Sequence, residues 1–135
     1  MILRNKRKMR FPILVSLCRV REIESVRETG SGLVIGAAAH LTDLENATQE
    51  SYAPIARILR YFASRQIKHV ATVGGSVCGA SPIGDMAPVL VALGARVTIG
   101  SLKGEREVDL ADFFLGYRKT VLVPGEVVIR FTVPP

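Results

Sequence analysis

The sequence is poor in the residues that build disulfide, metal and membrane proteins. It has no tryptophan and only two cysteines, Cys18 and Cys78, which lie far apart and match no C-x-x-C or metal-ligand spacing. These features predict neither a disulfide framework nor a zinc site, and they agree with a reducing compartment. No uncharged apolar run reaches the roughly 18 residues that a membrane-spanning helix needs. We therefore expect a cytoplasmic chain that does not enter a membrane.

The chain also lacks the charge pattern of a nucleic-acid-binding protein, although its formal net charge is +6. Several basic residues and no acidic one fall in the segment 1–10: Arg4, Lys6, Arg7, Lys8 and Arg10. Removing these five leaves 13 of the 18 basic residues against 12 acidic ones, so the body of the chain is close to neutral. Neither an aromatic residue in this segment nor a basic stripe elsewhere favours nucleic-acid binding. The apolar run that follows is short and broken by Pro12, unlike the core of a secretory signal.

Alternating short elements follow this basic N-terminal segment. A length of 135 residues and an apolar content of 48% indicate one globular domain, over residues 11–135. Short apolar or alternating runs predict strands at residues 11–17, 33–39, 95–100, 105–110 and 126–133. Helices are predicted from near residue 43 and over residues 53–66, 85–93 and 111–116. The pattern is typical of an α+β domain with a mixed or antiparallel sheet and short helices.

Local signals indicate where several of these helices begin and end. Thr42 and Glu45 form a T-x-x-E capping box, which predicts a helix start near Asp43. Pro54 suits the first turn of the next helix, and Gly94 suits the end of the helix that starts at residue 85.

One predicted loop covers residues 71–86, "ATVGGSVCGASPIGDM". It contains more glycine and more small polar residues than a simple turn needs. Gly74 and Gly75 can adopt positive φ and let a ligand approach the main chain, while successive N–H groups can converge on an anion. Thr72 and Ser76 add hydroxyl donors beside them. Asp85 can cap the following helix or accept hydrogen bonds from ribose hydroxyls, and spacing alone leaves both roles open.

Three motifs in order connect this loop with a known family. They are T-x-G-G and A-S-P-I-x-D within "ATVGGSVCGASPIGDM", and F-x-x-Y-R-K-T within "FFLGYRKTVLVPGEVVIRFTVPP". Together with "RFPILVSLCRVREI" and "GLVIGAAAHLTDLE" upstream, the chain resembles the FAD-binding domain of xanthine dehydrogenase and other molybdenum hydroxylases over nearly its whole length.

The resemblance implies a flavin-holding component of an oxidoreductase. In such enzymes the substrate is oxidised at a molybdopterin cofactor in another domain or subunit. Electrons then pass through iron–sulfur clusters to FAD and on to NAD⁺ or oxygen. We accordingly expect no catalytic side chain and no metal ligand here, with His40 and His69 as structural or surface residues.

The resemblance also implies which residues contact the cofactor. Residues 72–76 match the second flavin-phosphate loop: Thr72, Val73, Gly74, Gly75 and Ser76. Asp85 matches an acidic cofactor contact. Phe62, followed by Ala63, matches an aromatic residue on the adenine, and Val128 matches the opposite wall. Helical spacing alone also places Phe62 on a core face, whereas strict alternation in the last strand puts Val128 beside Arg130, away from Val127 and Ile129.

Two departures from the family pattern broaden the prediction. Ser76 stands where many xanthine dehydrogenases have asparagine, so the enzyme could instead be a carbon monoxide dehydrogenase, an aldehyde oxidase or a hydroxybenzoyl-CoA reductase. The family pattern also includes a first Gly-Gly-Thr loop before this region and a further domain after it. We therefore expect a domain truncated at both ends that binds FAD weakly or not at all by itself, or a non-catalytic interaction module.

Overall fold

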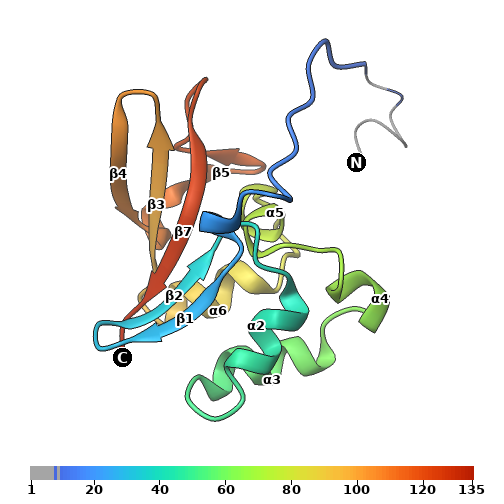
Figure 1. The fold of residues 1–135 in the computed structure, drawn as a ribbon, viewed down its shortest axis with the longest axis vertical. Helices are drawn as coiled ribbons and strands as arrows, with labels where there is room; N and C mark the ends of the chain where they lie inside the picture. Colours follow the sequence, from blue (N-terminus) through green and yellow to red (C-terminus); the bar gives the residue numbers. More distant parts are fainter. Residues whose placement is uncertain (1–7, 9) are drawn as a thin grey trace.

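A five-stranded sheet forms the centre of the chain in the computed structural model, which describes residues 8 and 10–135 (Figure 1). All neighbouring strands are antiparallel. In spatial order they are β1 (Val26–Thr29), β2 (Gly32–Gly36), β7 (Val127–Val133), β3 (Arg96–Ser101) and β4 (Gly104–Asp109). Most of the predicted basic segment 1–10 lies outside the described residues.

Short helices and one small hairpin complete the fold. The helices are η1 (Arg21–Ile23), α2 (Leu41–Ala47), α3 (Ala53–Tyr61), α4 (Arg65–Lys68), α5 (Val73–Cys78), α6 (Met86–Ala92) and η2 (Leu110–Phe113). The hairpin pairs β5 (Phe114–Gly116) with β6 (Lys119–Thr120). This arrangement confirms the predicted α+β class with an antiparallel sheet. None of the described helices is long and apolar enough to cross a membrane.

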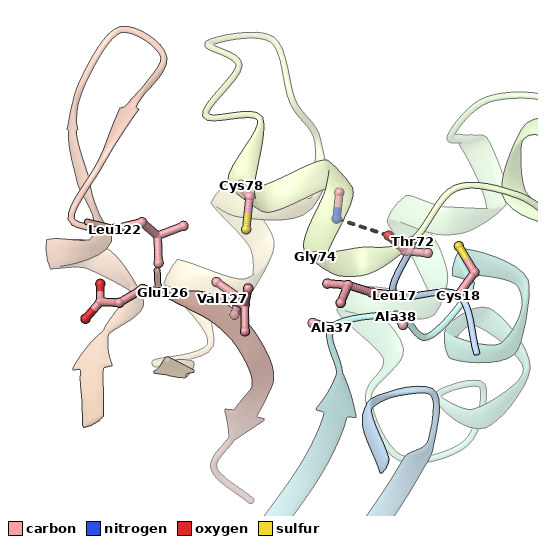
Figure 2. A pocket seen from close by; sticks show the side chains of 12 residues that line it. Leu17, Cys18, Ala37, Ala38, Thr72, Gly74, Cys78, Leu122, Glu126 and Val127 are labelled. Atoms are coloured by element: carbon pink, nitrogen blue, oxygen red, sulfur yellow. Dashed lines mark hydrogen bonds between the residues drawn. The ribbon is translucent and has the colours of Figure 1, made fainter. Parts of the chain in front are cut away.

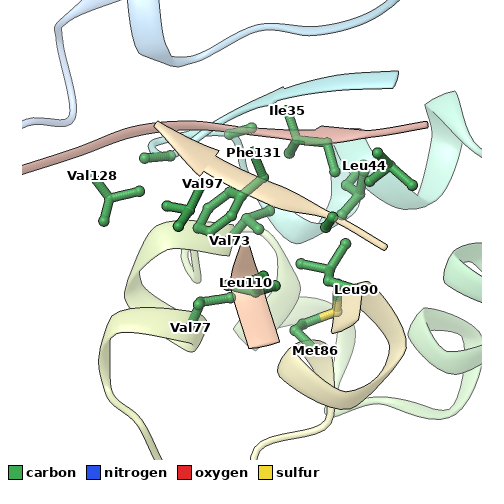
Figure 3. Close-up of a cluster of buried hydrophobic side chains, with 14 of the residues drawn as sticks. Ile35, Leu44, Val73, Val77, Met86, Leu90, Val97, Leu110, Val128 and Phe131 are labelled. Carbon is green, nitrogen blue, oxygen red and sulfur yellow. The ribbon is translucent and has the colours of Figure 1, made fainter. Parts of the chain in front are cut away.

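The core lies between the sheet and the helices α5 and α6. Figure 3 shows Phe131 and Val97 of the sheet facing Val77 of α5 and Leu90 of α6, and all four side chains are fully buried. Burying a side chain of this size contributes about 1.5–3 kcal/mol. The core therefore fixes α5 against the sheet, and α5 carries most of the T-x-G-G motif.

Several sequence signals are confirmed. Strands β3 and β4 form the predicted hairpin around Lys103, and Gly104 has φ +120°. Gly94 ends the α6 region with φ +68°, a conformation that favours glycine. Pro54 lies in the first turn of α3.

The predicted strand at residues 11–17 is not a strand. The segment is irregular and exposed, with Ile13 80% and Val15 79% accessible. The five-stranded sheet ends at β1 on one side and at β4 on the other. In the described part of the chain, no strand pairs with residues 11–17. Pro12 also removes a backbone donor that strand pairing would need. Apolar composition alone was therefore a misleading signal here.

Helix boundaries also differ from the predictions. Helix α2 begins at Leu41, without a side-chain cap, because Leu41 and Leu44 are both fully buried; Thr42 thereby falls inside the first turn. Helix α3 ends at Tyr61, and a separate short helix, α4, begins after Ser64. The stretch at residues 111–116 is divided between η2 and β5.

The predicted alternation of the last strand is wrong at its start because β7 contains a bulge. Thr98 pairs with Arg130, but Ile99 pairs with Val128, so Ile129 is an extra residue. The side chain of Val128 consequently joins the core cluster and is 5% exposed, whereas Val127 is 45% exposed. The bulge thus reverses the faces predicted for these two valines.

Candidate functional site

A cavity of about 360 Å³ lies where α5 meets the end of β2 and the beginning of β7. Figure 2 shows Leu122 and Glu126 on one side of it and Leu17 and Cys18 on the other. The complete lining is Leu17, Cys18, Ala37, Ala38, Thr72, Gly74, Gly75, Cys78, Leu122, Glu126, Val127 and Val128. Most of these groups are apolar, so the cavity suits a ring system with a few polar attachments.

Thr72 organises the start of α5 beside this cavity. Its hydroxyl oxygen accepts a hydrogen bond from the backbone N–H of Gly75 at 3.1 Å, drawn as the dashed line in Figure 2. The N–H of Val73 donates to Ala39 at 3.0 Å and that of Gly74 donates to Ala37 at 2.8 Å. The first turn therefore has its donors satisfied by the chain itself.

This geometry corrects the expected role of the two glycines. Gly74 and Gly75 lie in a helix, not in positive-φ conformations, and their N–H groups do not converge on an open anion site. Gly74 instead allows close packing, since an added Cβ would lie 2.7 Å from the carbonyl oxygen of Ala37. Gly75 is exposed, and an added Cβ would meet only the Thr72 hydroxyl, at 3.0 Å. A ligand can therefore reach the main chain at Gly75 but not at Gly74.

The cavity brings together only some of the predicted site residues. Thr72, Gly74, Gly75 and Val128 line it, although they come from α5 and from the distant strand β7. Val73 does not line it, because its side chain is fully buried in the core.

The other predicted residues lie outside the cavity wall. Phe62 follows the last residue of α3 and is half-buried, and Ala63 beside it is exposed with φ +48°. Asp85 precedes α6 but does not cap it with its side chain, so capping does not explain this residue. Its carboxylate is exposed and available to a ligand. Ser76 is half-buried on α5.

The mostly apolar lining of the cavity fits an aromatic ring of a flavin nucleotide, with the Thr72 hydroxyl as a polar contact. The apolar walls suit an aromatic ring, and the Thr72 hydroxyl can still donate its proton to a phosphate or ribose oxygen while accepting from Gly75. Within the described residues, no group of three or more His, Cys, Asp or Glu side chains could hold a metal ion.

Sequence patterns alone do not identify most of the cavity lining. Leu17 falls in the segment predicted as a strand, Cys18 follows it, and Leu122 lies in a loop without a predicted role. Glu126 is predicted as the first residue of the last strand but precedes β7, which begins at Val127. The signal for the loop was present in "KTVLVPGEV", since the Pro-Gly pair predicts a turn. No sequence signal indicated that Cys18 and Cys78 line the same cavity.

The two cysteines should differ strongly in reactivity. Burial raises the pKa of the Cys78 thiol to about 11, whereas Cys18 is exposed. At pH 8 only about one Cys78 in a thousand is then a thiolate. We expect iodoacetamide to modify Cys18 first and Cys78 slowly, with the Cys78 rate rising about tenfold per pH unit up to pH 10. Peptide mass spectrometry over time measures both rates, and equal rates at pH 8 would contradict this burial.

Comparison with known families agrees with the motifs. The family described as "FAD binding domain in molybdopterin dehydrogenase" matches residues 1–135. Among curated relatives, xanthine dehydrogenase/oxidase of Gallus gallus is 34% identical over 140 aligned positions, which cover 95% of this chain. Xanthine dehydrogenase of Blastobotrys adeninivorans is 40% identical over 117 positions, covering 78% of this chain. The match covers 10% and 8% of these two relatives, so the chain corresponds to a small part of each.

Solved structures give the same relationship. Quinoline 2-oxidoreductase from Pseudomonas putida 86 matches with a TM-score of 0.91 and 27% identity, covering 98% of this chain and 47% of that one. Carbon monoxide dehydrogenase from Hydrogenophaga pseudoflava matches with a TM-score of 0.82 and 30% identity, covering 86% of this chain and 41% of that one.

Proposed function

The chain belongs to the family of FAD-binding domains in molybdopterin dehydrogenases, and from this premise we propose that it supplies one part of the FAD site of a xanthine-dehydrogenase-like molybdenum hydroxylase. FAD is the cofactor of this family, and the iron–sulfur and molybdopterin groups belong to other domains or subunits of such enzymes. These parts would be the partners of this chain.

The observation that best supports the proposal is the cavity beside α5. Its wall contains Thr72 and the open face of Gly75, both from the T-x-G-G motif, and Val128 from the last strand. The T-x-G-G motif and the last strand, which are distant in the sequence, thus meet at one cavity, as a ligand bound by both would require. We propose that Thr72 and Ser76 hold phosphate or ribose oxygens and that Asp85 accepts from ribose hydroxyls.

The chain's own residues would bind and orient the cofactor and exclude water from it. When bound, FAD supplies the redox chemistry, accepting electrons that originate at the molybdenum centre and delivering them to NAD⁺ or oxygen. The apolar wall that includes Val128 would cover the adenine ring on one side, and Phe62 with Ala63 would contact the adenine from outside the cavity wall.

A second candidate keeps the cofactor and changes the enzyme. The structural similarity to quinoline 2-oxidoreductase and carbon monoxide dehydrogenase supports a flavin component of another molybdenum hydroxylase. The identity of the molybdopterin-binding partner distinguishes the two candidates, because substrate is oxidised in that partner. Purification of the tagged chain with its native partners, followed by assays with xanthine and with quinoline, tests this directly.

Titration of the purified chain with FAD, FMN and ADP tests cofactor binding. We expect saturable quenching of FAD fluorescence, competition by ADP and little binding of FMN. Thr72→Val should weaken FAD binding about tenfold, because it removes one hydroxyl contact and the acceptor for the Gly75 N–H. Asp85→Ala should weaken it by a similar factor if the carboxylate accepts from ribose.

Thr98→Val is a matched control for this titration. Thr98 is buried, and its hydroxyl also makes a hydrogen bond, donating to Glu107 at 3.3 Å, but it does not line the cavity. This variant should bind FAD like the original chain. A folded chain that binds neither FAD nor ADP would contradict cofactor binding and favour a non-catalytic interaction module.

A further inference from the structure

An ion pair between Arg106, outside the cavity, and Glu126, in its lining, holds the loop that forms the Leu122 side of the cavity. The loop connects β6 to β7, and it turns at Pro124 and Gly125, where the N–H of Glu126 donates to Val123 at 3.1 Å. Gly125 has φ +88°, as a Pro-Gly turn of type II requires. Few other backbone bonds hold this segment, so its position depends on side chains.

Arg106 of β4 and Glu126 supply that anchoring. The guanidinium donates from Nε to Oε1 and from Nη2 to Oε2 of Glu126, both at 2.8 Å. Nη2 also donates to the carbonyl oxygen of Val121 at 3.1 Å, and Oε2 accepts from the N–H of Val123 at 3.0 Å. We call this bidentate Arg106–Glu126 pair the fork. Its hydrogen bonds reach both ends of the loop, Val121 and Glu126, and connect the loop to strand β4 of the sheet.

The fork has bidentate geometry, which is the strong form of a charge-assisted hydrogen bond. Within it the Glu126 side chain is 12% exposed and the Arg106 side chain is 41% exposed. The Arg106 hydrogen bond, supported by the Val123 N–H, lowers the pKa of the Glu126 carboxyl to about 2. The carboxylate is therefore ionised, and the fork intact, at any pH well above that value.

Among the residues that the structure describes, Glu126 is also the only carboxylate that lines the cavity. Beside a cofactor that carries a negatively charged pyrophosphate, an unpaired carboxylate would be unfavourable. Arg106 neutralises this charge from outside, since it is not itself a lining residue.

We propose that Arg106 is a positioning residue for the cofactor, which it does not touch: its fork with Glu126 fixes the Leu122 side of the cavity. This inference rests on the proposed function. It differs from a purely structural role because it predicts an effect on FAD affinity at constant fold, with a characteristic dependence on pH.

Arg106→Leu in the full chain is the first test. We expect FAD affinity to fall about tenfold at pH 7.5, because the loop must now be ordered when the cofactor binds. The affinity of this variant should then rise as the pH is lowered from 7 to 4.5, because the released carboxyl has a higher pKa and loses its charge. The original chain should show no such rise over this range, since its Glu126 carboxyl stays ionised.

A double variant separates positioning from charge. Arg106→Leu with Glu126→Leu removes the unpaired carboxylate, so the pH dependence should disappear while the affinity stays about tenfold below the original. Arg96→Leu is the matched control, because Arg96 of β3 is also an ion-paired arginine of the sheet, with Glu107 and Asp109 of β4 at 3.2 Å each as its partners, and these partners lie outside the loop. It should bind FAD like the original chain.

Each outcome decides between distinct explanations. If the original chain does not bind FAD, the proposed function fails. If it does, and folded Arg106→Leu binds equally well or the double variant regains full affinity, the positioning role is overturned. Faster hydrogen exchange at the Val123 amide in Arg106→Leu would support it, because that amide donates to Glu126.

Discussion

Replacing Gly74 by alanine should lower the free energy of unfolding by about 1–3 kcal/mol. The new Cβ would lie 2.7 Å from the carbonyl oxygen of Ala37 and 3.0 Å from its Cβ. Neither atom can rotate away, because the Gly74 N–H donates to the same carbonyl at 2.8 Å. Helix α5 must therefore move away from the end of β2. Thermal or urea unfolding measures the loss.

Gly79→Ala is the matched control on the same helix. Gly79 follows α5 with φ −62°, and an added Cβ would make only an ordinary contact, 3.4 Å from the carbonyl oxygen of Gly75. A substitution at an unstrained position should stabilise the chain by about 0.4–1 kcal/mol. If Gly74→Ala were as stable as Gly79→Ala, the close packing of α5 against Ala37 would be wrong.

Local sequence signals predicted the parts of the fold that depend on neighbouring residues. The β3–β4 hairpin and the helix stop at Gly94 follow from turn chemistry within a few residues. The position of Val128 could not be found in this way. Its inward face depends on the bulge at Ile129, and the bulge exists only in the pairing of β7 with β3.

The candidate site was predicted only in part, because it too depends on contacts between residues that are distant in the sequence. The motif residues Thr72, Gly74 and Gly75 do line the cavity, but their roles differ from those that a loop would give them. The carbonyls of Ala37 and Ala39, which satisfy the N–H groups of α5, come from a distant part of the sequence. Which donors remain free for a ligand is therefore a tertiary property, and no local pattern contains it.

Gly75→Val should reduce FAD affinity about a hundredfold, corresponding to about 2.7 kcal/mol of binding free energy, while leaving the fold intact. Gly75 is exposed, and its missing Cβ faces the cavity and the Thr72 hydroxyl, not the packed backbone that Gly74 meets. A branched side chain would occupy the space where a ligand approaches α5. Fluorescence titration with FAD, together with circular dichroism of the variant, measures binding and folding separately.

Gly75→Ala tests whether the loss of FAD affinity increases with the size of the side chain at this position. Alanine adds only the Cβ, 3.0 Å from the Thr72 hydroxyl oxygen, so the affinity should fall by an intermediate factor of about tenfold. Gly74→Ala, in contrast, should lose stability before it loses binding, because its clash is with the backbone of Ala37. Equal FAD affinity for Gly75→Val and the original chain would mean that the cofactor does not approach α5. The T-x-G-G motif would then serve only to pack this helix against the sheet.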